Sequence, residues 1–145
     1  MSTQTIAQRR AAHALARIEK HEQRNRGHPE PDYGNYIGYV EALPATILTN
    51  GLGQACATLL SKDAGRLDRP HGLLYADLQD WLCGNDVAAP FRDSQYQGEG
   101  RLMEALCNSS QKRYLHAQTE AMAYLVWLKK FARAYLQHGE RGGDE

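Results

Sequence analysis

The N-terminal segment carries basic residues at a spacing that suits a row of phosphate groups. Its first 26 residues contain six arginine and lysine residues but only two glutamates. On a helix, Arg10, Arg17 and Arg24 lie one heptad apart and drift by only about 20° per heptad. They would span about 21 Å at a rise of about 1.5 Å per residue. Because guanidinium groups match phosphate oxygens, this spacing favours binding to a nucleic-acid backbone.

A second basic cluster, Lys129, Lys130 and Arg133, lies near the end of the last predicted helix. Cations there can also serve the helix itself, because they oppose the partial negative charge of its C-terminus. Charged faces of surface helices are commonly just solvated, so this second interpretation stays open for both segments. Our hypothesis is an RNA-facing edge that combines the two segments. Its candidate RNA-binding residues are Arg10, Arg17, Lys20, Arg24, Lys129, Lys130 and Arg133.

The overall charge limits how such an edge can work. Seventeen basic and seventeen acidic side chains cancel within the 145 residues, so the chain is not a polycation. A protein that binds nucleic acid through bulk charge is more basic than this. RNA binding must therefore come from a local patch or from a larger assembly that supplies more positive charge.

Motifs for catalysis or metal binding are absent from the sequence. The six histidines are scattered, without a His-Glu-x-x-His pair. The run Asn50-Gly-Leu-Gly-Gln54 has neither the spacing nor the lysine of a phosphate-binding loop. Ser109 and Ser110 belong to no nucleophile motif, and the three cysteines are interpreted as small buried hydrophobes. We therefore predict no catalytic residue, no metal and no cofactor.

Apolar residues recur at helical spacing through most of the chain. In the last predicted helix, steps of four and three form one stripe from Ala121, Leu125, Leu128, Ala132 and Tyr135. Sustained period-two alternation is absent from the sequence, so no sheet is expected. Helices are predicted at about residues 3–24, 33–43, 45–61, 71–83, 101–107 and 111–138. The prediction is an all-α, single-domain bundle of five to six helices over residues 1–138, with a long C-terminal helix and a disordered tail at 139–145.

The helix boundaries depend on a few residues. Ser2 or Thr3 is expected to cap the first helix. Pro44 is expected to separate the second helix from the third, because proline cannot donate a helical hydrogen bond. The glycines of Asn50-Gly-Leu-Gly-Gln54 leave room either for a helix bend with a close helix contact or for a neighbouring subunit.

Two aromatic residues of the last predicted helix are expected to pack rather than to stack on RNA bases. Trp127 and Phe131 are four residues apart, so they share one face of the helix. Their neighbours Leu125 and Leu128 need apolar cover, which these rings can supply.

The sequence offers no segment for a membrane. No window approaches the roughly 20 apolar residues of a membrane span, and the N-terminus lacks the apolar core of a signal peptide. Free, widely separated cysteines agree with a reducing compartment. We therefore expect a soluble, cytoplasmic protein without membrane contact.

Three stretches together resemble one protein family. They are residues 39–54 (YVEALPATILTNGLGQ), 78–82 (LQDWL) and 118–132 (QTEAMAYLVWLKKFA). Their order and spacing resemble the small helical subunit of the type III-B CRISPR effector, the Cmr complex built around RAMP-module proteins. The resemblance covers about residues 3 to 138. It departs from the family at Cys56 and Thr58, which are smaller than usual, and at Asn85–Arg92, which looks like an insertion.

The resemblance implies a noncatalytic subunit in antiviral defence. Proteins of this family stack in several copies as a minor helical filament. That filament lies against the backbone RAMP subunit, which carries the crRNA, and beside the large polymerase-like subunit. The implied partners are thus crRNA, target RNA, both of those subunits and further copies of the chain itself. RNA cleavage in the family belongs to the backbone subunit.

The residues alone leave another class of function open. A small neutral helical protein can equally be a helical adaptor or a dimeric protein-interaction module with no RNA role. The two classes differ in whether the basic residues affect RNA capture by an assembled complex.

Overall fold

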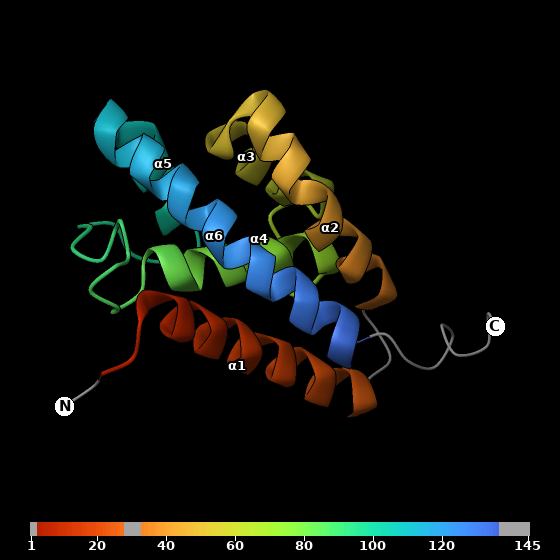
Figure 1. Cartoon of the computed structure of the whole chain (residues 1–145). Coiled ribbons are helices and arrows are strands. Elements are labelled where there is room, and N and C mark those ends of the chain that lie inside the picture. The colour runs from red at the N-terminus through yellow and green to blue at the C-terminus, as the bar shows by residue number, and fades with distance from the viewer. Residues whose placement is uncertain (1–2, 28–32, 137–145) are drawn as a thin grey trace.

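The computed structural model describes residues 3–27 and 33–136 of the chain. In these two ranges it contains no strand and six α-helices (Figure 1). They are α1 (Ile6–Gly27), α2 (Tyr33–Asn50), α3 (Leu52–Lys62), α4 (Pro70–Leu82), α5 (Arg101–Asn108) and α6 (Gln111–Tyr135). The all-α fold with a long C-terminal helix is therefore confirmed. The tail predicted to be disordered, residues 139–145, lies outside the described residues.

Helix α6 is the element around which the others are arranged. Figure 1 shows it crossing the molecule between α1 and α2, with α4 behind it. Arg10 and His13 of α1 contact Glu120 and Tyr124 of α6, so these two helices run parallel. The order is reversed for α2, since its Glu41 meets the end of α6 whereas the residues just beyond Asn50 meet its first half. Helices α2 and α6 are therefore antiparallel.

Buried side chains from all six helices form one core. In α6 the predicted stripe is confirmed at Ala121, Leu125, Leu128 and Ala132, which are all fully buried. The prediction was wrong for Tyr135, whose side chain is about half exposed. Leu136 is buried instead, because it lies four residues after Ala132 and so continues the same face.

The start of α1 differs from the prediction by a few residues. Thr5 Oγ1 accepts a hydrogen bond from the Gln8 backbone N–H at 3.1 Å. In return, Gln8 Oε1 accepts from the Thr5 backbone N–H at 2.8 Å. This reciprocal pair is a capping box, so Thr5 caps the helix in place of Thr3. Ser2, the other predicted cap, lies outside the described residues.

The boundary between the second and third helices was wrongly placed at Pro44. Helix α2 continues through Pro44 to Asn50, and the chain breaks at Gly51. Gly51 has φ 89°, a left-handed backbone conformation that glycine adopts without steric cost. Proline removes only one helical donor, and the buried Leu43 and Ile47 on either side of it hold α2 against the core. The positive φ, and not the missing N–H, ends the helix.

No helix among the described residues combines the length and the apolar character that crossing a bilayer would require.

Candidate nucleic-acid interface

Arg10 is committed to a partner inside the protein. Its Nε and Nη2 donate to the two oxygens of Glu120, at 2.6 Å and 2.9 Å. Glu120 is only 4% exposed and also accepts a hydrogen bond from Trp81 Nε1 at 2.8 Å. The hydrogen bond with Glu120 raises the pKa of Arg10. A buried carboxylate needs such a counterion, so Arg10 serves the fold.

Arg17, one heptad further along the same face of α1, has a similar role. Its Nε donates to Asp77 Oδ1 at 2.5 Å, and Asp77 is fully buried on α4. His21 Nε2 lies 2.9 Å from Asp77 Oδ2, and Tyr36 donates its hydroxyl to the same oxygen. Burial alone would raise the pKa of Asp77, but His21 and Arg17 together lower it. The carboxylate therefore stays charged at the centre of a hydrogen-bonded cluster.

His13 links α1 to two further helices. Its Nε2 lies 2.7 Å from Asp80 Oδ2 on α4, and its Nδ1 lies 2.7 Å from the hydroxyl of Tyr124 on α6. The hydrogen bond from His13 lowers the pKa of Asp80. We call the whole inward-facing set the polar seam. It consists of Arg10, His13, Arg17 and His21 with their partners Asp77, Asp80 and Glu120.

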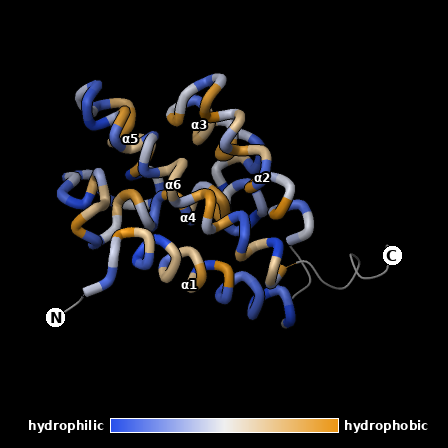
Figure 2. Tube along the Cα trace, in the orientation of Figure 1, coloured by the Kyte–Doolittle hydropathy of each residue, from blue (hydrophilic) through white to orange (hydrophobic). Residues whose placement is uncertain are grey.

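Lys20 and Arg24 lie on the same face of α1, on either side of His21 in the sequence. They follow His13 and Arg17 at helical spacing, but both are exposed. Neither forms an ion pair with any residue in the described ranges. Figure 2 shows the C-terminal half of α1 as a mainly hydrophilic stretch. An external anion would therefore not have to displace any carboxylate of the described residues from these two cations.

The three candidate RNA-binding cations of α6 have different surroundings. Arg133 pairs with Glu41 of α2. Lys129 is half-buried and Lys130 is exposed, and neither has an ion-pair partner within residues 3–27 and 33–136. Of the three, only these two therefore carry a charge that no carboxylate of the described residues pairs with.

The structure separates the seven candidate residues into two groups. Arg10, Arg17 and Arg133 are held by carboxylates of the chain. The other four, Lys20, Arg24, Lys129 and Lys130, form a group that we call the basic end. The offset of about 110 residues between contacting positions of α1 and α6 places Lys20 level with Lys130. Figure 1 shows the C-terminal ends of both helices at the same end of the molecule.

The two halves of the basic end lie on different sides of the helix pair. Lys20 and Arg24 share the face of α1 that contacts α4 at His13 and Arg17. On α6, Arg133 reaches α2, and Lys129 precedes it by one helical turn. An RNA strand that contacts both halves would have to pass around the ends of the helices.

The glycine-rich run at residues 50–54 is a docking point for α6. The Leu52 N–H donates to Gln118 Oε1 at 2.9 Å, and the Gly53 N–H donates to the Tyr114 hydroxyl at 2.7 Å. A Cβ on Gly53 would stand 3.1 Å from that hydroxyl oxygen. The run therefore makes a bend and a close helix contact, as the first of its two interpretations predicted. Gln118 and Tyr114 satisfy donors at the start of α3 that its own turns leave free.

Trp127 and Phe131 pack as expected from the sequence. Both are half-buried against the core, and their ring centroids are 6.0 Å apart. Phe131 is followed by Tyr135 at 6.3 Å. The contacts of Trp127 and Phe131 with the core indicate a structural role.

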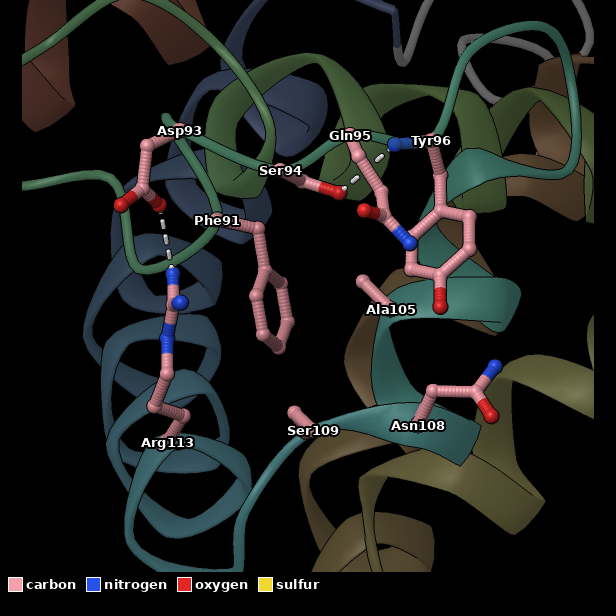
Figure 3. A pocket seen from close by; sticks show the side chains of 9 residues that line it. All are labelled: Phe91, Asp93, Ser94, Gln95, Tyr96, Ala105, Asn108, Ser109 and Arg113. Carbon is pink, nitrogen blue, oxygen red and sulfur yellow. Dashed lines mark hydrogen bonds and ion pairs between the residues drawn. The ribbon is translucent and has the colours of Figure 1, made fainter.

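A cavity of about 260 Å³ lies between α5, the start of α6 and the irregular segment that precedes α5 (Figure 3). Arg113 lines it, but its guanidinium is bound to Asp93 and to the Pro90 carbonyl and lies over the Phe91 ring. Ser109 also lines it, and its Oγ is buried with no hydrogen-bond partner in the described part of the chain. A serine nucleophile needs a neighbouring base, which this hydroxyl lacks.

Comparison with known families identifies the family of the chain. The family model of the CRISPR-associated protein Cas_Cmr5 matches residues 6–135. The matched range begins at the first residue of α1 and ends at the last residue of α6, so it includes the polar seam and the basic end.

Proposed function

The chain belongs to the Cas_Cmr5 family of CRISPR-associated proteins, and we propose that it is a noncatalytic subunit that helps a Cmr effector complex hold RNA. In this proposal it forms part of the minor helical filament of a cytoplasmic ribonucleoprotein. Its neighbours are further copies of itself, the backbone RAMP subunit and the large polymerase-like subunit. The RNA partners are the crRNA and the target RNA bound to it.

The observation that carries the RNA role is the basic end. Lys20, Arg24, Lys129 and Lys130 have no ion-pair partner among the described residues, although carboxylates hold Arg10, Arg17 and Arg133. Unpaired cations attract phosphates without regard to base sequence. Four such charges on a neutral chain give weak binding by one copy, so tight capture requires the assembled complex.

Exposed apolar side chains support the place in an assembly. Leu48 is 73% exposed on α2, and Leu115 and Val126 are about half exposed on α6. Leu115 and Val126 lie eleven residues apart, which puts them on one face of the helix. Single exposed apolar side chains are common on protein surfaces, so these three are points at which a neighbouring subunit could make contact and do not define an interface.

The test is RNA capture by a reconstituted complex. Two double variants, Lys20→Ala with Arg24→Ala and Lys129→Ala with Lys130→Ala, are compared with the parent over a range of salt concentrations. For each bond to phosphate that a variant removes, the slope of log affinity against log salt should fall by about 0.7 for a single strand. A matched control is Arg92→Ala with Lys112→Ala, two exposed cations near the other end of α6, which should leave the slope unchanged.

The adaptor function is the alternative that the same experiment addresses. If both double variants assemble and capture RNA with the affinity and salt slope of the parent, the basic end has no RNA role. The chain would then act through its protein contacts alone.

A further inference from the structure

An apolar groove between α2 and α3 is not used by any contact described so far. It has a volume of about 150 Å³ and ends at the start of α4. Six of its lining residues carry the argument: Tyr39, Leu43, Ala55, Thr58, Lys62 and His71. An apolar cavity of about this volume can hold a molecule the size of benzene. The groove therefore fits one aliphatic or aromatic side chain.

The end wall of the groove is built rigidly. The rings of Tyr39 and His71 are stacked, with centroids 3.7 Å apart and planes inclined by 18°. Asp63 Oδ2 accepts hydrogen bonds from the backbone N–H groups of His71 and Gly72, at 2.9 Å and 3.1 Å, and so fixes the start of α4. A preformed wall of this kind loses little entropy when it binds a partner.

The charge around the groove is one-sided. Lys62 is exposed, and no described residue forms an ion pair with it. No carboxylate of the described residues lines the groove, and the nearby Asp63 accepts from the N–H groups of α4 and lies 3.7 Å from Nδ1 of His71. The methylene groups of Lys62 can cover apolar surface while its ammonium stays in water. A group bound here would thus have an apolar part in the groove and a carboxylate next to Lys62.

RNA is a poorer occupant than a protein segment. A nucleobase carries polar edges that need hydrogen-bond partners when they are buried. The groove offers few, because its accessible lining is almost entirely carbon even where polar residues contribute to it, and the Thr46 hydroxyl already donates to the Ala42 carbonyl. A leucine side chain has no such requirement.

We propose that this groove docks a protein partner through a leucine-sized side chain with a carboxylate beside it. The partner's source, another subunit of the complex, rests on the proposed function, but the chemistry of the groove does not. The α2–α3 groove is also separate from the basic end, because none of its lining residues belongs to that group.

The groove can be probed directly in the full chain by NMR. The probe is the capped dipeptide acetyl-Leu-Asp-amide, added to ¹⁵N-labelled protein at millimolar concentrations. Amide shifts should change around Thr58 and Lys62. Acetyl-Ala-Asp-amide should bind about tenfold more weakly or worse, because it leaves the apolar part of the groove empty. Acetyl-Leu-Asn-amide, which lacks the charge, should also bind more weakly.

A filled groove provides the matched control. Thr58→Phe should occupy the space and abolish the shifts caused by the Leu-Asp probe. Ala57→Phe places the same ring on an exposed neighbouring residue that does not line the groove, so it should leave binding unchanged. Circular dichroism of both variants verifies that they fold. Shifts that persist in Thr58→Phe, or equal binding of all three dipeptides, would overturn the proposal.

The reconstituted complex identifies the partner. A photo-crosslinking benzoylphenylalanine at position 57, which is exposed beside the groove and leaves it open, should form an adduct with a protein segment in which an apolar residue lies next to an acidic one. An adduct with RNA, or no adduct in a complex that captures RNA normally, would contradict the groove proposal alone. Unchanged RNA capture by the basic-end variants would instead contradict the proposed function, so the two failures are distinguishable.

Discussion

The first half of α1 and its last turns carry the same kind of residue at the same spacing but have opposite surroundings. Arg10 and Arg17 point into the molecule and hold the buried carboxylates of Glu120 and Asp77. Arg24, one heptad further along, is exposed and has no ion-pair partner in the described residues. Heptad spacing therefore shows that residues share a helical face, but it does not show whether that face meets a buried acid or solvent.

This difference indicates that the two regions of α1 have different roles. The polar seam stabilises the packing of α1 on α4 and α6, whereas the basic end is available to an external partner. Substitutions in the first region should therefore affect stability, and substitutions in the second should affect RNA capture. The predictions below test that division.

The largest effect is expected at Asp77. Asp77→Asn leaves Arg17 and His21 without their shared anion in a buried site. Breaking a buried charge pair typically costs about 3–5 kcal/mol, so the free energy of unfolding should fall by about that much. Urea titration measures it. The control is Asp68→Asn, which removes an exposed partner of Arg66 and should change stability little. Comparable losses in both variants would contradict the special role of the buried carboxylate.

Trp127 should give the next largest loss if its role is packing. Replacing a fully buried aromatic residue by alanine costs about 3–5 kcal/mol, and because Trp127 is half-buried we expect about 2 kcal/mol for Trp127→Ala. Thermal unfolding measures the loss. A variant that is as stable as the parent but captures RNA less well would show that Trp127 serves RNA binding and not packing.

Two glycines, one within α2 and one directly after it, extend the comparison to the backbone. Gly51 has φ 89°, so Gly51→Ala should destabilise the protein by about 1 kcal/mol or more through backbone strain. Gly38 lies within α2, and a Cβ added there would meet nothing within 4 Å. Gly38→Ala should therefore stabilise the protein by about 0.5–1 kcal/mol. Chemical unfolding of both variants should give changes of opposite sign.

The smallest expected effect is on how the free energy of unfolding changes at acidic pH. The pKa of Asp77 is lower in the folded protein than its usual value near 3.9 in an unfolded chain. Its stabilisation is therefore fully present above that unfolded value and is lost as the pH falls through the folded pKa. Urea unfolding at several pH values below about 5 should give a steeper loss for the parent than for Asp77→Asn. Identical slopes would mean that Asp77 does not carry this dependence.

The overall fold could be predicted from the sequence because its signal is periodic. The stripe of α6 and the absence of alternating strands both follow from local pattern. The boundary at Pro44 was wrong because its neighbours Leu43 and Ile47 are anchored in the core. Tertiary packing of this kind overrides a local helix-breaking preference.

The candidate site was harder to predict because charged residues follow the same helical spacing whether they are paired inside the protein or exposed to solvent. Asp77 and Glu120 were missed, although each stands among apolar residues of its helix. One signal was available in α1. Arg10 and Arg17 share their face with Ala14 and Ile18, which are both fully buried, so that face had to meet other helices. The partners that the arginines meet there depend on long-range packing, which spacing does not encode.

The most direct test of the central claim is the free energy of unfolding of Arg17→Ala compared with that of Arg24→Ala. The two substitutions are identical in chemistry and one heptad apart. We expect Arg17→Ala to lose about 3 kcal/mol, because it leaves Asp77 buried without one of its cations. Arg24→Ala should stay within about 0.5 kcal/mol of the parent, as exposed substitutions usually do. Equal stability of the two variants would contradict the division of α1 into an inward-facing seam and an outward-facing basic end.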